Sequence, residues 1–72
     1  MKLYGYEEGR ENLLTIQEIS ICANSEELMM ISRFFLKASR RFSENSTTKG
    51  HIHFKDFTGN QKLPVDIIVV KE

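Results

Sequence analysis

The chain has 72 residues, one cysteine, and ten acidic against ten basic side chains, so its formal net charge is zero. A chain of this length forms a single domain, residues 1–72, near the lower size limit for a self-sufficient hydrophobic core. A zero net charge produces no overall field that attracts nucleic acid or an anionic membrane, so we expect neither partner. The single Cys22 cannot form an internal disulfide, and residues 1–10 lack the apolar run of a signal peptide. We therefore expect a cytoplasmic protein.

Two strands are predicted at the start of the chain. Residues 2–6 (KLYGY) alternate weakly and are rich in aromatic side chains, which favours a short edge strand. After a turn, residues 13–22 (LLTIQEISIC) predict a longer strand, but its apolar residues change phase after Ile16. Either a bulge near Gln17 and Glu18 or a strand that is apolar on both faces explains this change, and the sequence leaves both open.

Residues 24–44 (NSEELMMISRFFLKASRRFSE) predict one long amphipathic helix. Asn24 and Glu27 have the spacing of a capping box, and the acidic first turn and basic last turn suit the helix dipole. The predicted buried stripe has apolar residues three and four apart, namely Leu28, Ile31, Phe35, Ala38 and Phe42. The predicted wet face carries Arg33, Lys37, Arg40 and Glu44. Since Phe35 lies on the stripe, Phe35→Ala is expected to cost about 3–5 kcal/mol.

The remainder of the chain predicts loops and short strands. Residues 45–50 are polar and predict a mobile connection. Residues 51–57 (HIHFKDF) are either a strand or a short helical turn that places Phe54 and Phe57 three apart. The β-branched run at 65–70 (VDIIVV) favours a strand near the sheet centre, covered on both faces.

The predicted fold class is α+β, with one amphipathic helix packed on a small, mainly antiparallel sheet of three to four strands in ββαβ(β) order. One helix covers only one face of such a sheet. Apolar surface on the last strand is therefore left for another segment, a second copy of the chain or a different protein.

Few residues have the arrangement that catalysis or metal binding needs. His51 and His53 form an H-x-H pair that points both rings to one side of a strand, with Asp56 as a conceivable third metal ligand. No second ligand cluster accompanies them, so we expect structural histidines and no metal or cofactor. Cys22 precedes a helix start, which can lower a thiol pKa, but a lone cysteine there is more often a buried apolar residue. We therefore expect no enzymatic activity.

A basic ridge is predicted along the outer face of the helix, formed by Arg33, Lys37, Arg40 and Arg41. Met30 and Phe34 flank this ridge off the predicted core stripe. Cations beside an exposed methionine and phenylalanine are typical of a surface that docks an acidic protein. RNA binding needs several stacking aromatics, and only Phe34 is available here.

Three segments together, LTIQEISICANSEELMMISRFFLKAS, GHIHFKDF and LPVDIIVVKE, resemble the immunity protein 32 family of bacterial polymorphic toxin systems. The matching motifs are the S-x-E-E-L helix start, a helix of FLLKAA type, H-x-H-F-x-D-F and the terminal D-I-I-V strand. They correspond here to Glu26, Glu27 and Leu28; Phe35, Leu36, Lys37 and Ala38; His51, His53, Phe54, Asp56 and Phe57; and Asp66, Ile67, Ile68 and Val69. The chain departs from the family at Asn24-Ser25, in place of Ser-Pro, and at GNQKLP, in place of a tryptophan-rich approach to the last strand.

The resemblance implies a cytoplasmic bacterial protein that neutralises a cognate toxin by binding it. It makes His51, His53, Asp56 and Phe57 residues that brace the fold or face the partner, and the basic ridge with Phe34 is a second candidate surface. The alternative function is a small homodimeric regulatory or structural module, in which the Met30/Phe34 flank and the terminal strand form the self-contact.

Overall fold

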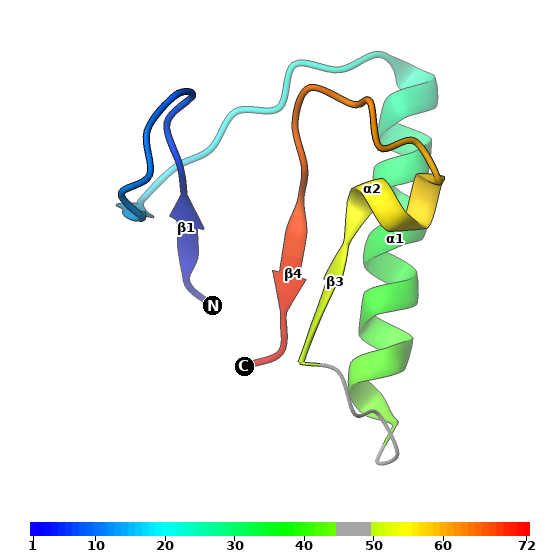
Figure 1. The fold of residues 1–72 in the computed structure, drawn as a ribbon. Helices are drawn as coiled ribbons and strands as arrows, with labels where there is room; N and C mark the ends of the chain where they lie inside the picture. Colours follow the sequence, from blue (N-terminus) through cyan, green and yellow to red (C-terminus); the bar gives the residue numbers. More distant parts are fainter. Residues whose placement is uncertain (45–49) are drawn as a thin grey trace.

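The computed structural model describes residues 1–44 and 50–72 as an α+β fold (Figure 1). Its elements in chain order are β1 (Leu3–Gly5), β2 (Leu14–Ile16), α1 (Ser25–Ser43), β3 (His51–His53), α2 (Phe54–Thr58) and β4 (Ile68–Val70). The strands form two separate antiparallel sheets, β1 with β2 and β3 with β4. The predicted fold class is thus confirmed, but the strands are divided between two sheets. The predicted mobile connection falls on residues 45–49, outside the described part of the chain.

The first sheet is a hairpin in which Leu3 pairs with Ile16. The predicted strand at 2–6 is therefore confirmed, whereas the strand predicted over 13–22 is too long. Regular pairing stops after Ile16, and Ile19 and Ile21 lie exposed in an irregular connection to α1. The change of apolar phase marks the end of the strand, not a bulge within it.

Helix α1 begins and ends close to the residues that the sequence predicts. The Asn24 carboxamide oxygen accepts a hydrogen bond of 2.8 Å from the Glu27 backbone N–H, and the Asn24 N–H donates one of 3.0 Å to the Glu27 carboxylate. This reciprocal arrangement is a capping box, because it satisfies two backbone donors that a helix start leaves unpaired. The local signal in the sequence is thus sufficient to place this boundary.

The core lies where α1 meets α2 and β3. Among the described residues, three hydrophobic side chains are buried, those of Ile31, Phe34 and Ala38. Phe34 is completely buried, whereas Phe35 is 45% exposed, so the predicted stripe is correct at Ile31 and Ala38 and wrong at Phe35. Leu28 is also exposed. The stripe shifts toward Phe34 because the aromatic side chains of α2 pack on that side of the helix.

The second sheet and α2 resolve the alternatives left open for residues 51–57. Both occur, since residues 51–53 form β3 and the chain then turns directly into α2. In the described residues β4 pairs with β3 alone, and Ile68 and Val70 on its outer face are exposed. The predicted central strand, covered on both faces, is therefore wrong.

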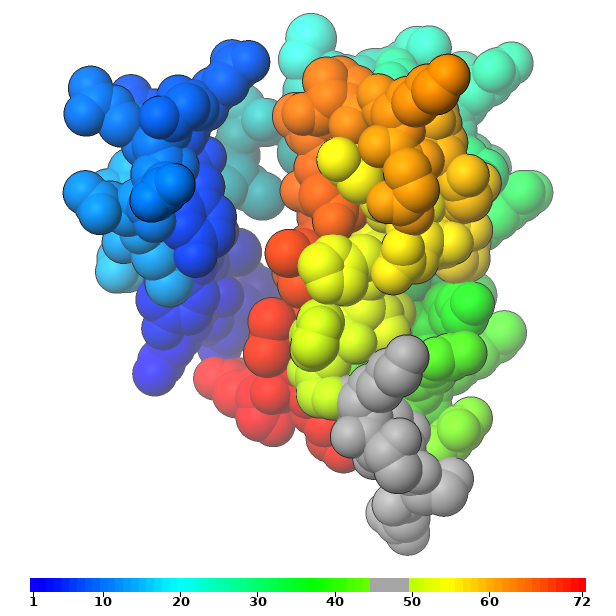
Figure 2. All heavy atoms as spheres, in the orientation of Figure 1, coloured from blue at the N-terminus to red at the C-terminus, as the bar shows by residue number. Residues whose placement is uncertain are grey.

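The hairpin stands apart from the second sheet. Figure 2 shows an open gap between the β1–β2 hairpin and β4, with the segment that leads into α1 visible behind it. An ion pair of 3.4 Å between the N-terminal amine and Glu72 links the two parts at the chain ends. Both of these groups are exposed, so this pair contributes little to stability.

Candidate binding site

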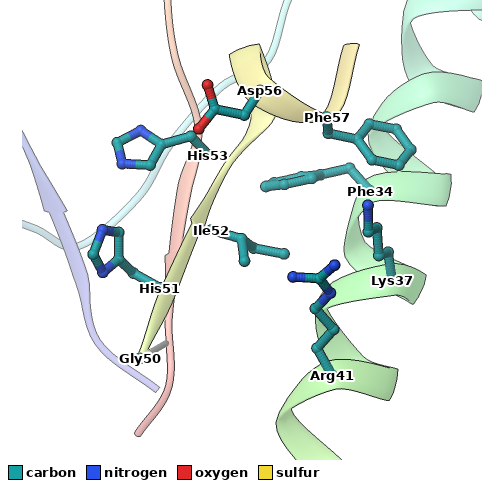
Figure 3. A pocket seen from close by; sticks show the side chains of 9 residues that line it. All are labelled: Phe34, Lys37, Arg41, Gly50, His51, Ile52, His53, Asp56 and Phe57. Carbon is teal, nitrogen blue, oxygen red and sulfur yellow. The ribbon is translucent and has the colours of Figure 1, made fainter. Parts of the chain in front are cut away.

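A hollow of about 770 Å³, open to solvent, lies between α1, β3 and α2 (Figure 3). Its lining residues are Phe34, Lys37, Arg41, Gly50, His51, Ile52, His53, Asp56 and Phe57. We call it the α1–β3 hollow. Seven of the nine residues predicted as binding candidates line it, and they come from three different elements. The two others, Arg33 and Arg40, are exposed on α1 outside the hollow.

The floor of the hollow is an aromatic cluster centred on Phe34. Its ring centroid lies 5.3 Å from that of Phe54, in an edge-on arrangement, and 5.6 Å from that of Phe57. These are the separations at which aromatic rings attract beyond the burial of their area. The prediction of Phe34 as an exposed docking residue is therefore wrong, since Phe34 supports the floor and leaves Phe57 and Ile52 as the half-buried apolar surface.

Two cationic side chains from successive turns of α1 stand over this floor. The Lys37 ammonium lies 5.4 Å from the centroid of the Phe57 ring, within cation–π range. Figure 3 shows Arg41 extending from the next turn toward Ile52. The basic ridge predicted on the helix is thus divided, because Lys37 and Arg41 turn toward the hollow while Arg33 and Arg40 do not line it.

The two histidines lie together on one side of β3, as alternation along a strand predicts (Figure 3). Their ring centroids are 5.3 Å apart in an edge-on arrangement. His51 is exposed, whereas His53 is half-buried and is held by Asp66, whose Oδ2 lies 2.7 Å from His53 Nδ1. An ionised carboxylate accepts hydrogen bonds but cannot donate them, so the proton of this contact lies on Nδ1.

Asp66 does not line the hollow but holds His53, which does, and sequence reasoning assigned it no role. Its Oδ1 accepts backbone hydrogen bonds of 3.0 Å from Lys55 and 2.9 Å from Ile67. Burial raises the pKa of the Asp66 carboxyl, but the hydrogen bond from the His53 ring and these two N–H groups outweigh that effect and lower the pKa below its ordinary value. The resemblance includes Asp66 in its D-I-I-V motif, and that motif is the one signal in the sequence that singles it out.

Asp56 does not join the histidines. Its Oδ1 instead accepts a hydrogen bond of 2.8 Å from the Gln61 side chain. In residues 1–44 and 50–72 no group of three or more histidine, cysteine, aspartate or glutamate side chains is placed to hold a metal ion. Cys22, expected to be buried, is exposed on the segment before α1.

Comparisons with known proteins identify no relative. No protein-family model, no curated protein and no solved structure matches the chain. The family resemblance therefore depends on the motif residues alone. In the part of the chain that the structure describes, no helix is long and apolar enough to cross a membrane.

Proposed function

We propose that the protein neutralises a cognate toxin in the cytoplasm by binding it directly, with the α1–β3 hollow as the contact surface. The motif resemblance to toxin immunity proteins supports the toxin as partner. The geometry of the hollow supports binding to a protein, because it combines a rigid aromatic floor with a rim of polar and cationic side chains.

The single observation that carries the proposal is that Lys37 and Arg41 of α1 reach over Phe57 and Ile52 in the hollow, while the two histidines project from the other side of β3 (Figure 3). A protein surface that fits this arrangement presents an apolar side chain to the Phe57 ring and carboxylates to the cations at the rim. Aromatic contacts at the centre and charges at the edge are the usual division in protein interfaces, where the centre supplies affinity and the edge supplies specificity.

The test is co-expression of this chain with the toxic gene encoded beside its own, with survival of the host cells as the measurement. The proposal expects survival with the chain and death without it. Absence of protection against every neighbouring gene product contradicts the proposal.

Surface variants then locate the contact. Lys37→Glu and His51→Ala alter exposed side chains at the rim and are expected to reduce toxin binding at least about 10-fold each. Arg33→Glu reverses a charge on the same helix outside the hollow, so it separates the hollow from the outer part of the basic ridge. Lys62→Glu, in an exposed turn, is the matched control for charge reversal. Loss of binding in Arg33→Glu with normal binding in Lys37→Glu and His51→Ala contradicts the hollow as the contact.

A further inference from the structure

Helix α1 has a second face that the α1–β3 hollow does not use. At about 100° per residue, one arc of roughly 120° of the helix carries no charged residue. Between Leu28 and Ser39 its members, all exposed, are Leu28, Met29, Ser32, Phe35, Leu36 and Ser39. We call this arc the uncharged flank. The four apolar side chains on it are each between 45% and 53% exposed, which is unusual for large apolar residues that cluster on one helix face.

The chain as a whole exposes more surface than a compact monomer of its mass. The chain exposes 6535 Å², whereas a compact monomer of 8.4 kDa exposes about 4,600 Å². The excess is about 1,900 Å². Five residues of an extended chain expose at most about 800 Å². Subtracting that amount for residues 45–49 still leaves an excess of roughly 1,100 Å². A stable protein–protein interface buries about 800 Å² on each partner. The excess of the whole chain, to which both the separate hairpin and the flank of α1 contribute, is of that size.

We propose that the uncharged flank of α1 packs against the same flank of a second copy of this chain, and that the protein is a homodimer in solution. A self-contact needs a surface that is complementary to itself. A flank without charges meets that condition, because no like charges oppose each other across the symmetry axis. The chain as a whole has a net charge of zero, so two copies do not repel at long range.

One of the two serines on the flank already has a hydrogen-bond partner within the helix. The Ser32 hydroxyl already donates a hydrogen bond of 2.8 Å to the Met29 carbonyl of the same helix. A hydroxyl that is satisfied inside its own helix can be covered by a partner without losing a bond to water. Ser32 and the four apolar side chains can therefore lie at the dry centre of an interface.

A second copy is favoured over the toxin as occupant for two reasons. The cationic rim of the α1–β3 hollow suits a partner of different, acidic chemistry, whereas the flank has no charge with which to select one. In addition, the described residues of the monomer bury three hydrophobic side chains, so the folded state needs additional burial at all times. The partner present wherever this chain is made is another copy of it.

The first experiment measures mass and stability of the unaltered protein. Sedimentation equilibrium at micromolar concentration is expected to give twice the chain mass, and the thermal midpoint is expected to rise with protein concentration, because folding and association are coupled. A mass of one chain at about 0.1 mM, together with a melt that does not depend on concentration, overturns the proposal. A stable mass other than two chains also overturns it.

The second experiment places the interface. Phe35→Asp puts a charge in the uncharged flank of both copies and is expected to raise the dimer dissociation constant at least about 100-fold. Val65→Asp is the matched control, since Val65 is an apolar residue with 69% exposure that lies outside α1. If Phe35→Asp does not fold, Ser39→Asp introduces the same charge at a polar position of the flank. A dimer that persists in both flank variants, or that dissociates in Val65→Asp instead, overturns the assignment of the flank.

Discussion

His53 and Asp66 are thirteen residues apart in the sequence, yet His53 Nδ1 and Asp66 Oδ2 lie 2.7 Å apart. The contact links the start of α2 to the segment that enters β4. The same carboxylate accepts the Lys55 N–H, and the Ile67 carbonyl accepts the Phe54 N–H at 2.8 Å. The His53 side chain at the start of α2 makes no capping hydrogen bond to the helix. The bonds from the Phe54 and Lys55 N–H groups therefore satisfy the first backbone donors of α2 and fix one wall of the α1–β3 hollow.

Acid stability is the first property that this contact predicts. The pKa of Asp66 is lowered in the folded state, so its contribution to the free energy of unfolding is fully present above the unfolded pKa of about 3.9 and is lost as pH falls through the lower folded pKa. Asp66→Asn keeps an oxygen for the two N–H groups but does not titrate. Urea unfolding from about pH 6 down to about pH 2 measures the free energy of unfolding of both proteins. The wild type is expected to be more stable than Asp66→Asn above about pH 4, and this difference is expected to shrink below that pH. A difference that stays constant over this range contradicts the prediction.

The capping box of α1 gives a second prediction. Asn24→Ala removes the acceptor for the Glu27 N–H and is expected to lower the free energy of unfolding by about 1 kcal/mol. Asn24→Asp is the matched control, because its carboxylate accepts the same bond and suits the positive end of the helix dipole. Chemical denaturation followed by circular dichroism measures both variants. Equal stabilities for the alanine and aspartate variants are inconsistent with a capping role.

The end of α2 gives a third prediction. Gly59 has φ of 74° and its N–H donates to the Lys55 carbonyl, so it terminates the helix in the left-handed region. A side chain at this φ is strained, and Gly59→Ala is expected to cost about 1 kcal/mol. Gly50→Ala is the control, because a Cβ there meets no atom within 4 Å and its φ lies outside the positive range. An equal loss of stability in the two variants would show that strain at Gly59 is not the cause.

Features that depend on interactions between residues close in the sequence could be predicted, whereas features that depend on contacts between distant segments could not. The bounds of α1 could be predicted because the capping box and the apolar spacing are local. Asp66 received no role because its contacts with His53 and Lys55 exist only once β3 and β4 are paired in register. The candidate residues 51–57 do line the hollow with Lys37 and Arg41, but their approach depends on how α1 crosses β3. No spacing within the sequence contains that information.

The neighbouring phenylalanines 34 and 35 show this limit most directly. Both are apolar and the two positions differ by about 100° around α1, so either can belong to the buried stripe. The choice is made by α2, whose Phe54 and Phe57 rings surround Phe34. Phe35 contacts the cluster from outside, with its ring centroid 5.9 Å from that of Phe34.

A pair of alanine substitutions tests this assignment. At one fixed protein concentration, Phe34→Ala is expected to lower the free energy of unfolding by about 3–5 kcal/mol, because it leaves a cavity among three aromatic side chains. This loss approaches the whole stability of a chain of this size, so cooperative melting is expected to disappear. Phe35→Ala removes a ring that is already 45% exposed and is expected to cost about 1–2 kcal/mol, with a cooperative melt retained. Thermal melting followed by circular dichroism distinguishes the two. A loss in Phe35→Ala that equals or exceeds the loss in Phe34→Ala contradicts the assignment of Phe34 as the centre of the core.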